Sequence, residues 1–87
     1  MLRIHGSALK HGCTREDVSH AYDMALYEGI LDDDDDPPKL LIIGFDGAAR
    51  LLELIGAELD NGDVLIWHAM ECRKHYLNLL PDPGGEQ

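Results

Sequence analysis

Residues 51–76 read LLELIGAELDNGDVLIWHAMECRKHY, and an Asp-Asn-Gly-Asp segment at residues 60–63 separates two apolar runs in this stretch. Asn and Gly both tolerate the positive φ angles of a type I′ turn, whose twist matches that of the flanking strands. We therefore predict a β-hairpin here, followed by a helix. Because successive side chains of a strand alternate between faces, Val64, Ile66 and His68 are expected to share one face.

The chain has 87 residues, which suffices for one small domain with a single core. We predict one domain over residues 1–80 and a flexible tail over residues 81–87, where prolines and glycines end the helical pattern. No apolar run approaches the roughly 18 residues of a membrane span, and the first residues lack the apolar core of a secretory signal. We expect a cytoplasmic protein without membrane contact, in which Cys13 and Cys72 are free thiols.

The charge balance is acidic, with 17 Asp and Glu residues against 7 Lys and Arg residues and a formal net charge of -10. This composition argues against a general nucleic-acid binder, because such binding normally draws on a basic surface. Residues 32–36 are five consecutive aspartates, and Pro37 and Pro38 follow them. We interpret this run as a solvated loop; a divalent-cation site and a contact for a basic partner are the alternatives. The spacing of a calcium loop is missing.

Local patterns predict the elements that precede the hairpin. Residues 2–5 suit a short edge strand, and residues 14–17 resemble a capping box that begins a helix over about residues 15–26. Residues 27–31 form a predicted strand. Residues 39–45 form another, which should be central because its apolar run is nearly continuous.

The complete order of elements predicts the fold class. Residues 51–59 form a strand in which Gly56 indicates a bulge or a close backbone approach. Residues 73–80 form a C-terminal helix. We expect an α+β domain with an antiparallel sheet of three to five strands, on which N-terminal helices and the C-terminal helix are packed.

Several short motifs together resemble the BrnT family. They are Lys10-His11-Gly12 before an acidic helix, Ile43-Gly44 at a strand end, Arg50-Leu51-Leu52 at the next strand, and His68-Ala69-Met70 followed by Arg73, Lys74 and Tyr76. The resemblance covers about residues 10–76, with matching element order. The family consists of small bacterial ribonuclease toxins with a RelE-like fold, each neutralised by a DNA-binding antitoxin encoded alongside. The chain departs from it in its acidic charge and in lacking a Trp-Asp opening.

That resemblance implies a RelE-like fold and a function as the toxin of a type II toxin–antitoxin system. It implies a metal-independent endoribonuclease whose substrate is RNA and whose partner is a cognate DNA-binding antitoxin. A homodimer and a toxin–antitoxin heterotetramer are both compatible with it.

The residue types agree with metal-free RNA cleavage. Such a reaction needs a base for the 2′-hydroxyl, an acid for the 5′-oxygen and cations for the phosphoryl oxygens. Histidine, with an unperturbed pKa of about 6.5, suits proton transfer, and the arginine fork suits phosphate. The catalytic candidates are the acid/base pair His11 and His68, the phosphate clamp Arg50 and Arg73, and Tyr76 as a hydrogen-bonding or stacking group. Lys10 and Lys74 are substrate-binding candidates.

Structural roles remain open for the same residues. His68 would then be satisfied by backbone contacts in a half-buried strand, and His11 would place its charge at the end of a short helix. Arg50 and Arg73 would pair with surplus carboxylates, and Tyr76 would anchor its helix in the core.

A metal site and a cofactor are not predicted. His68, Cys72 and His75 straddle a strand end and a helix, so their geometry does not suit a shared ion. The alternative function is a non-catalytic protein-interaction domain with the same fold, whose acidic surface docks a basic partner.

Overall fold

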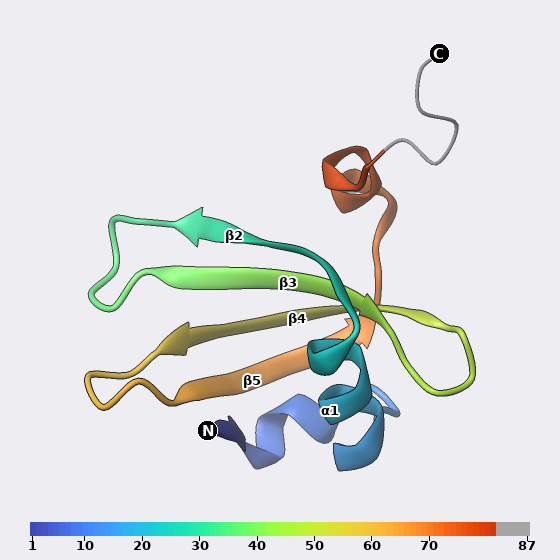
Figure 1. The fold of residues 1–87 in the computed structure, drawn as a ribbon, viewed down its shortest axis with the longest axis horizontal. Coiled ribbons are helices and arrows are strands. Elements are labelled where there is room, and N and C mark those ends of the chain that lie inside the picture. The colour runs from blue at the N-terminus through green and yellow to red at the C-terminus, as the bar shows by residue number, and fades with distance from the viewer. Residues whose placement is uncertain (82–87) are drawn as a thin grey trace.

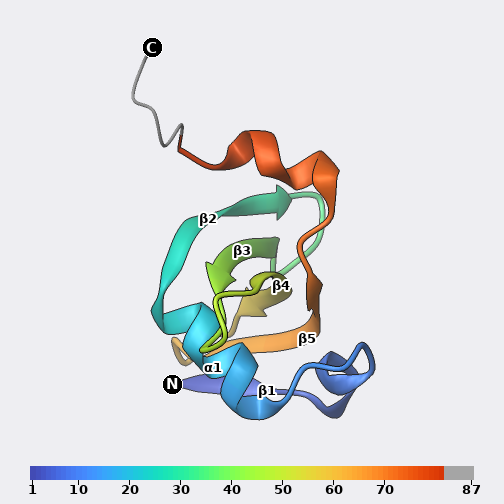
Figure 2. The same cartoon turned by 90° about the vertical axis from the view of Figure 1, so that its right-hand side faces the viewer.

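A computed structural model describes residues 1–81 of the chain. These residues form a five-stranded sheet in the order β1-β5-β4-β3-β2, with short helices around it (Figures 1 and 2). The elements are β1 (Leu2–Ile4), the 3-10 helix η1 (Gly6–Leu9), α1 (Arg15–Asp23), β2 (Ala25–Asp32), β3 (Lys39–Phe45), β4 (Leu51–Glu58), β5 (Val64–Glu71) and the 3-10 helix η2 (Lys74–Leu79). No helix among them is long and apolar enough to cross a membrane.

The predicted α+β class is confirmed and the sheet has five strands, within the predicted three to five, but it is mixed rather than antiparallel. β1 runs parallel to β5, while the other neighbouring strands run antiparallel. The predicted edge strand at residues 2–5 is confirmed by β1, and the predicted strand at residues 39–45 is β3. Most of the predicted tail, residues 82–87, lies outside the described residues.

The predicted hairpin is formed by β4 and β5, but its turn differs from the prediction. The backbone N–H of Gly62 donates to the carbonyl oxygen of Leu59 (2.9 Å), and the N–H of Leu59 donates to Asp63 (2.7 Å). Gly62 has a φ of 90°, whereas Asn61 does not have a positive φ. The loop therefore has three residues with glycine in the left-handed position, and the predicted type I′ turn is wrong.

A bulge in β5 changes which side chains share a face of the sheet. Ile55 of β4 pairs with His68, but the next residue, Gly56, pairs with Ile66, so Trp67 is an extra residue in β5. This agrees with the irregularity that Gly56 predicts.

His68 consequently points away from the core. Val64 and Ile66 lie in the core cluster, and after the extra residue Ala69 takes the next place in it. The expectation that His68 shares a face with Val64 and Ile66 is therefore wrong. His68 lies on the sheet face opposite α1, here called the far face.

The core lies between α1 and the other side of the sheet, here called the helix face. Its buried members are Ala8, Cys13, Val18, Ala21, Ile42, Leu52, Leu54, Val64, Ile66 and Ala69. Gly44 allows α1 to approach β3 closely, because a Cβ at this position would collide with the carbonyl oxygen of Ala21. β3 is central, as predicted: Leu41, Ile42 and Ile43 are almost fully buried.

The capping box that begins α1 is confirmed. The Thr14 hydroxyl accepts a hydrogen bond from the backbone N–H of Asp17 (3.1 Å), and the Asp17 carboxylate accepts one from the N–H of Thr14 (2.8 Å). The helix ends at Asp23 rather than at the predicted Leu26, because Ala25 and Leu26 belong to β2 beside β3.

Thr14→Ala is expected to lower the free energy of unfolding by about 1 kcal/mol, because the amide of Asp17 loses its hydroxyl acceptor. Urea denaturation followed by circular dichroism measures the change. Thr14→Ser keeps the hydroxyl and is the matched control. Equal losses in both variants would contradict a stabilising role for this hydroxyl.

The C-terminal helix differs from the prediction in type and position. η2 is a 3-10 helix without a buried residue, and Leu77 and Leu79 in it remain exposed. Figures 1 and 2 show η2 beyond β2, at the opposite end of the molecule from α1. Arg73 is extended (φ -77°, ψ 152°) and bonded to the sheet, so the helical turns begin only after the chain has left it. The predicted packing of this helix on the sheet is therefore wrong.

Candidate active site

Glu53 is a carboxylate at the centre of the sheet, on β4 between Ile43 of β3 and Met70 of β5. Its side chain has 0% exposed surface, which a charged residue rarely shows unless it is paired. The flanking Leu52 and Leu54 belong to the core on the helix face. Glu53 therefore points to the far face, as His68 does.

Arg73 and His68 donate the hydrogen bonds that this carboxylate accepts. Arg73 donates through its backbone N–H (2.9 Å), through Nε (3.1 Å) and through Nη2 (2.7 Å). His68 donates through Nε2 (3.0 Å). Among residues 1–81, no buried side-chain nitrogen or oxygen lacks a partner. A carboxylate satisfied by an arginine fork is among the strongest polar contacts in proteins.

These hydrogen bonds fix the ionisation of Glu53. Burial by itself raises the pKa of Glu53, but the hydrogen bonds from Arg73 and His68 outweigh burial and leave the pKa below its ordinary value. The bond to Glu53 raises the pKa of Arg73 in turn. Glu53 is therefore ionised at neutral pH.

The ionised carboxylate also determines the tautomer of His68. A carboxylate only accepts hydrogen bonds, so Nε2 of His68 must carry the proton that is shared with Glu53. In the neutral imidazole this leaves the lone pair on Nδ1. His68 is thus oriented as a base by a buried acid.

His11 and Tyr76 lie beside this pair. The ring of His11 lies edge-on to that of His68, with 5.7 Å between centroids. The guanidinium of Arg73 lies 5.6 Å from the centre of the Tyr76 ring. We call His11, Glu53, His68, Arg73 and Tyr76 the Glu53 cluster. Its Arg73 and His68 side chains are 45% and 23% exposed, so a ligand can reach both.

Arg50 does not join this cluster. Its Nε donates to Asp46 (3.0 Å), and its Nη2 lies 3.5 Å from a carboxylate oxygen of Asp17 on α1. Asp46 is buried, and the hydrogen bonds from Arg50 and the neighbouring backbone hold its pKa below the usual range. Arg50 thus lies on the helix face and Arg73 on the far face, so the expected two-arginine clamp is not assembled. The structural role of Arg50 fits this geometry.

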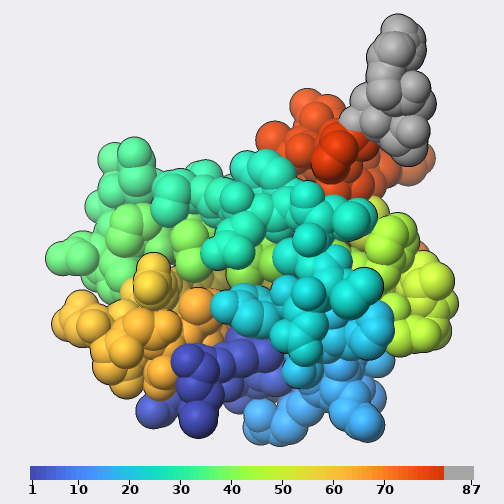
Figure 3. Space-filling view, in the orientation of Figure 1, coloured from blue at the N-terminus to red at the C-terminus, as the bar shows by residue number. Residues whose placement is uncertain are grey.

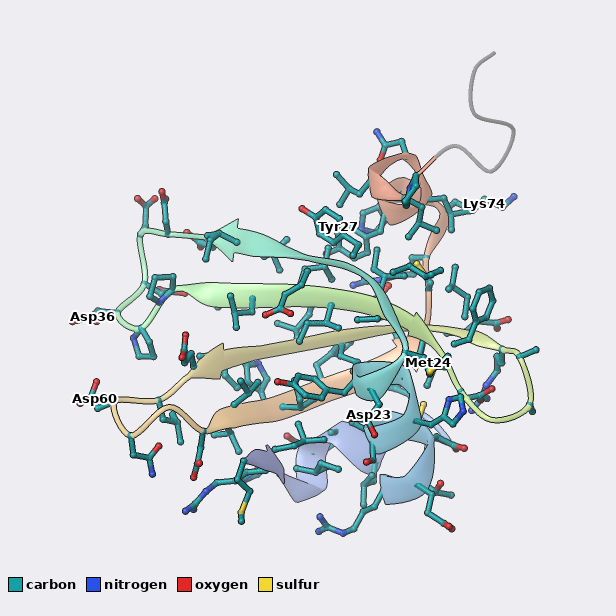
Figure 4. All side chains as sticks on the ribbon, in the orientation of Figure 1. Asp23, Met24, Tyr27, Asp36, Asp60 and Lys74 are labelled. Atoms are coloured by element: carbon teal, nitrogen blue, oxygen red, sulfur yellow. The ribbon has the colours of Figure 1, made fainter. Side chains whose placement is uncertain are left out.

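The two candidate lysines are exposed. Lys10 lies just after η1 and directly before His11. Lys74 begins η2 and points away from the sheet (Figure 4). A role for either side chain in binding substrate stays a prediction.

Glu53 is the residue of the cluster that sequence reasoning missed. The signal was an acid inside the apolar run Leu51-Leu52-Glu53-Leu54 of a predicted strand. A carboxylate that a strand buries must find a cationic or hydrogen-bonding partner. That rule would have drawn attention to the histidine of the adjoining strand and to the arginine two residues after that strand ends.

The described residues contain one group of side chains close enough to share an ion. The carboxylate oxygens of Asp32, Asp33 and Asp34 lie within 4.8 Å of one another, at the end of β2 and in the exposed acidic segment that follows it. Burial raises the pKa of Cys72, which disfavours the thiolate that a metal would need. Neither feature adds a metal to the Glu53 cluster.

A surface hollow of about 500 Å³ lies along α1, on the helix side of the sheet. Its lining residues are Thr14, Glu16, Asp17, Ser19, His20, Asp23 and Gly47. Three of them are carboxylates, and His20 uses Nδ1 to bond the carbonyl oxygen of Phe45 (2.8 Å). Carboxylates repel phosphate, so this hollow does not suit RNA.

Comparison of the chain with protein-family models, with curated proteins and with solved structures gives no match. The function of the chain must therefore be inferred from the geometry of the Glu53 cluster.

Proposed function

We propose that the chain is a metal-independent endoribonuclease of RelE-like fold, the toxin of a type II toxin–antitoxin system acting in the cytoplasm. The observation that supports this proposal best is the bond between Glu53 and His68, with Arg73 and His11 next to it. A base thus lies beside a second imidazole and shares the Glu53 carboxylate with a cation. These are the groups that RNA cleavage without a metal requires.

The reaction begins at the ribose. His68 takes the proton of the 2′-hydroxyl on Nδ1, and the 2′-oxygen attacks phosphorus. The bond from phosphorus to the 5′-oxygen breaks, and His11 gives its proton to that oxygen. The products are a 2′,3′-cyclic phosphate and a free 5′-hydroxyl. Glu53 stabilises the imidazolium that forms on His68.

Arg73 supplies the cation for the phosphate. Its Nε and one Nη2 hydrogen are bonded to Glu53, so within residues 1–81 the other three of the five guanidinium N–H donors have no partner. Glu53 also fixes the direction of the guanidinium plane, which lowers the cost of binding a phosphoryl oxygen in the transition state. Tyr76, beside Arg73, offers a ring for a base.

The acidic net charge does not oppose this site, because the acid is concentrated in another part of the chain. Residues 23–36 contain seven Asp and Glu residues and no Lys or Arg. The remaining residues hold ten acidic side chains against all seven basic ones, a net charge of only -3. The part of the chain that carries the Glu53 cluster is therefore much less acidic than the total charge suggests.

RNA cleavage by the purified chain in a metal chelator tests the proposal. We expect cleavage to continue and to yield fragments that end in a 2′,3′-cyclic phosphate. An RNA with a single 2′-deoxy residue before the cut should stay intact at that position, since the nucleophile is gone. Fragments with a 3′-hydroxyl, or activity that disappears with the chelator, would contradict the scheme.

A second candidate is a non-catalytic docking domain of the same fold, favoured by the acid concentrated in residues 23–36. In that case Glu53, His68 and Arg73 serve to fasten the C-terminal segment to the sheet. Expression of the isolated chain in bacteria separates the two. Growth arrest that a double substitution of His68 and Arg73 relieves favours the nuclease, and harmless expression favours docking.

A further inference from the structure

We propose that the free edge of β2 binds an extended basic segment of a partner protein, which adds a strand to the sheet. β2 is the last strand of the sheet and, within residues 1–81, pairs only with β3. An edge strand offers unpaired N–H and C=O groups as a template for another strand. Figure 3 shows β2 at the surface, with η2 beside its upper right part. The inference describes the chemistry of the partner protein in the proposed function, and it rests on that function only for the existence of such a partner.

Large apolar side chains are exposed in β2 and at Met24, the residue just before it. Met24 is 57% exposed, Leu26 45%, Ile30 55% and Leu31 38%. A single exposed apolar residue is ordinary, but four exposed apolar residues within the eight positions 24–31 are an unusual concentration along the sequence.

The usual protection of an edge strand is weak in β2. Lys and Pro, which block strand addition, are absent from Ala25–Asp32. Its two register irregularities lie near its ends, between Ala25 and Tyr27 and between Ile30 and Asp32. The segment Tyr27–Ile30 between them keeps regular pairing with β3, so its outer edge has the geometry that a further strand needs.

The negative charge of this edge favours a basic partner segment over a second copy of the chain. Residues 23–36 carry seven carboxylates without a basic residue, and the exposed run that ends at Asp36 forms the loop after β2 (Figure 4). Glu28 lies within β2, and Asp23 ends α1 directly before it. A second copy of this chain would bring the same acidic edge against it, and opposed like charges destabilise strand pairs. A basic segment removes this repulsion.

The partner segment is thus defined by its chemistry. It is an extended strand in which Lys or Arg alternates with Val, Ile or Leu. Backbone pairing with Tyr27–Ile30 supplies the sequence-independent part of the affinity. Glu28 and Ile30 share one face of β2 and Tyr27 lies on the other, so the basic side chains reach Glu28 on the first face and the apolar side chains cover Tyr27 on the second.

Amide hydrogen exchange and NMR titration of the full chain with synthetic peptides test the proposal. The probe is a nine-residue peptide of alternating Lys and Val; one matched control has Glu for Lys, and the other has Pro at the central Val. With about 1 mM probe we expect slower exchange at amides within residues 25–32 and weaker binding as salt rises. Both control peptides should bind far less.

Two charge-reversal variants locate the contact. Glu28→Lys should weaken probe binding by about fivefold, since an attractive cross-strand pair becomes a repulsive one. Glu71→Lys makes the same change of charge at an exposed position of β5 and should leave binding near wild type. RNA cleavage is not part of this readout, so the two proposals fail separately.

The contrary outcomes are equally specific. Probe shifts confined to the Glu53 cluster, equal binding of the Lys and Glu peptides, or unchanged exchange at residues 25–32 would each overturn the proposal. Sedimentation that shows a homodimer, with protection of the same amides, would assign the edge to a second copy of the chain instead.

Discussion

Alanine in place of His68 is expected to lower the rate of RNA cleavage by about 10²- to 10⁴-fold, the usual contribution of a positioned acid or base. The buried Glu53 directs the Nε2 proton of His68 and leaves Nδ1 as the base, and alanine removes both groups at once. The fold should survive, because His68 is 23% exposed and lies outside the core cluster. Single-turnover cleavage of an end-labelled RNA measures the effect.

His20→Gln is the matched control for this experiment. His20 lies on α1 and bonds the carbonyl oxygen of Phe45, and glutamine keeps a donor for that bond. Its cleavage rate should stay close to wild type. If His68→Ala cuts as fast as wild type while circular dichroism shows both folded, the Glu53 cluster is not catalytic. An equal loss in both variants would point to damage of the fold rather than of the site.

The elements that sequence reasoning located correctly are those with local signals. The strand Lys39–Phe45 has a continuous apolar run, and Thr14 with Asp17 forms the capping box that their spacing predicts. The end of α1 was harder to predict. Ala25 continues the apolar period of Val18 and Ala21, yet it pairs with Gly44 of β3, a contact nineteen residues away that local periodicity does not contain.

The orientation of His68 shows why a correct strand can still give a wrong face. Gly56 indicates an irregularity, but the extra residue belongs to the partner strand, where Trp67 shifts every later side chain. If the alternation of side chains is counted from Val64, His68 is therefore assigned to the wrong face of the sheet. Knowledge of the pairing between β4 and β5 was needed, and pairing is set by the whole sheet.

The candidate site residues also fall into two groups, those that the fold brings together and one that it does not. His11, His68, Arg73 and Tyr76 were selected as residue types that handle phosphate, and they do gather at one place. Arg50 has the same chemistry but sits four residues after the buried Asp46, which binds it. Residue type alone does not tell a free guanidinium from one already paired with a carboxylate.

Glu53→Gln is expected to lower the free energy of unfolding at neutral pH by about 1–3 kcal/mol, because Arg73 and His68 lose their common acceptor charge. Removing one partner of a wholly buried ion pair costs more, about 3–5 kcal/mol. Here the Arg73 side chain is 45% exposed, so water replaces part of the lost contact. Urea unfolding measured at a series of pH values gives both the size and the pH dependence of the loss.

The pH dependence has a definite sign. The pKa of Glu53 is lowered in the folded chain, so its stabilising effect is present above the unfolded pKa of about 4.3 and is lost as pH falls through the folded pKa. Wild type and Glu53→Gln should therefore differ most near neutral pH and converge in acid. The pKa values of Asp46 and Asp63 are lowered too, so both proteins still lose stability in acid. The difference between the two curves isolates Glu53.

Glu71→Gln, an exposed acid on β5, serves as the control and should stay within about 0.5 kcal/mol of wild type at every pH. A Glu53→Gln loss of constant size from neutral to acidic pH would mean that packing, not ionisation, stabilises this position. Glu53→Gln is also informative for catalysis, because the glutamine oxygen can still accept a hydrogen bond from Nε2–H of His68 but does not stabilise an imidazolium. Cleavage should then fall while the neutral His68 keeps its orientation, so a folded Glu53→Gln variant with full activity would remove Glu53 from the reaction and leave it a purely structural anchor for Arg73.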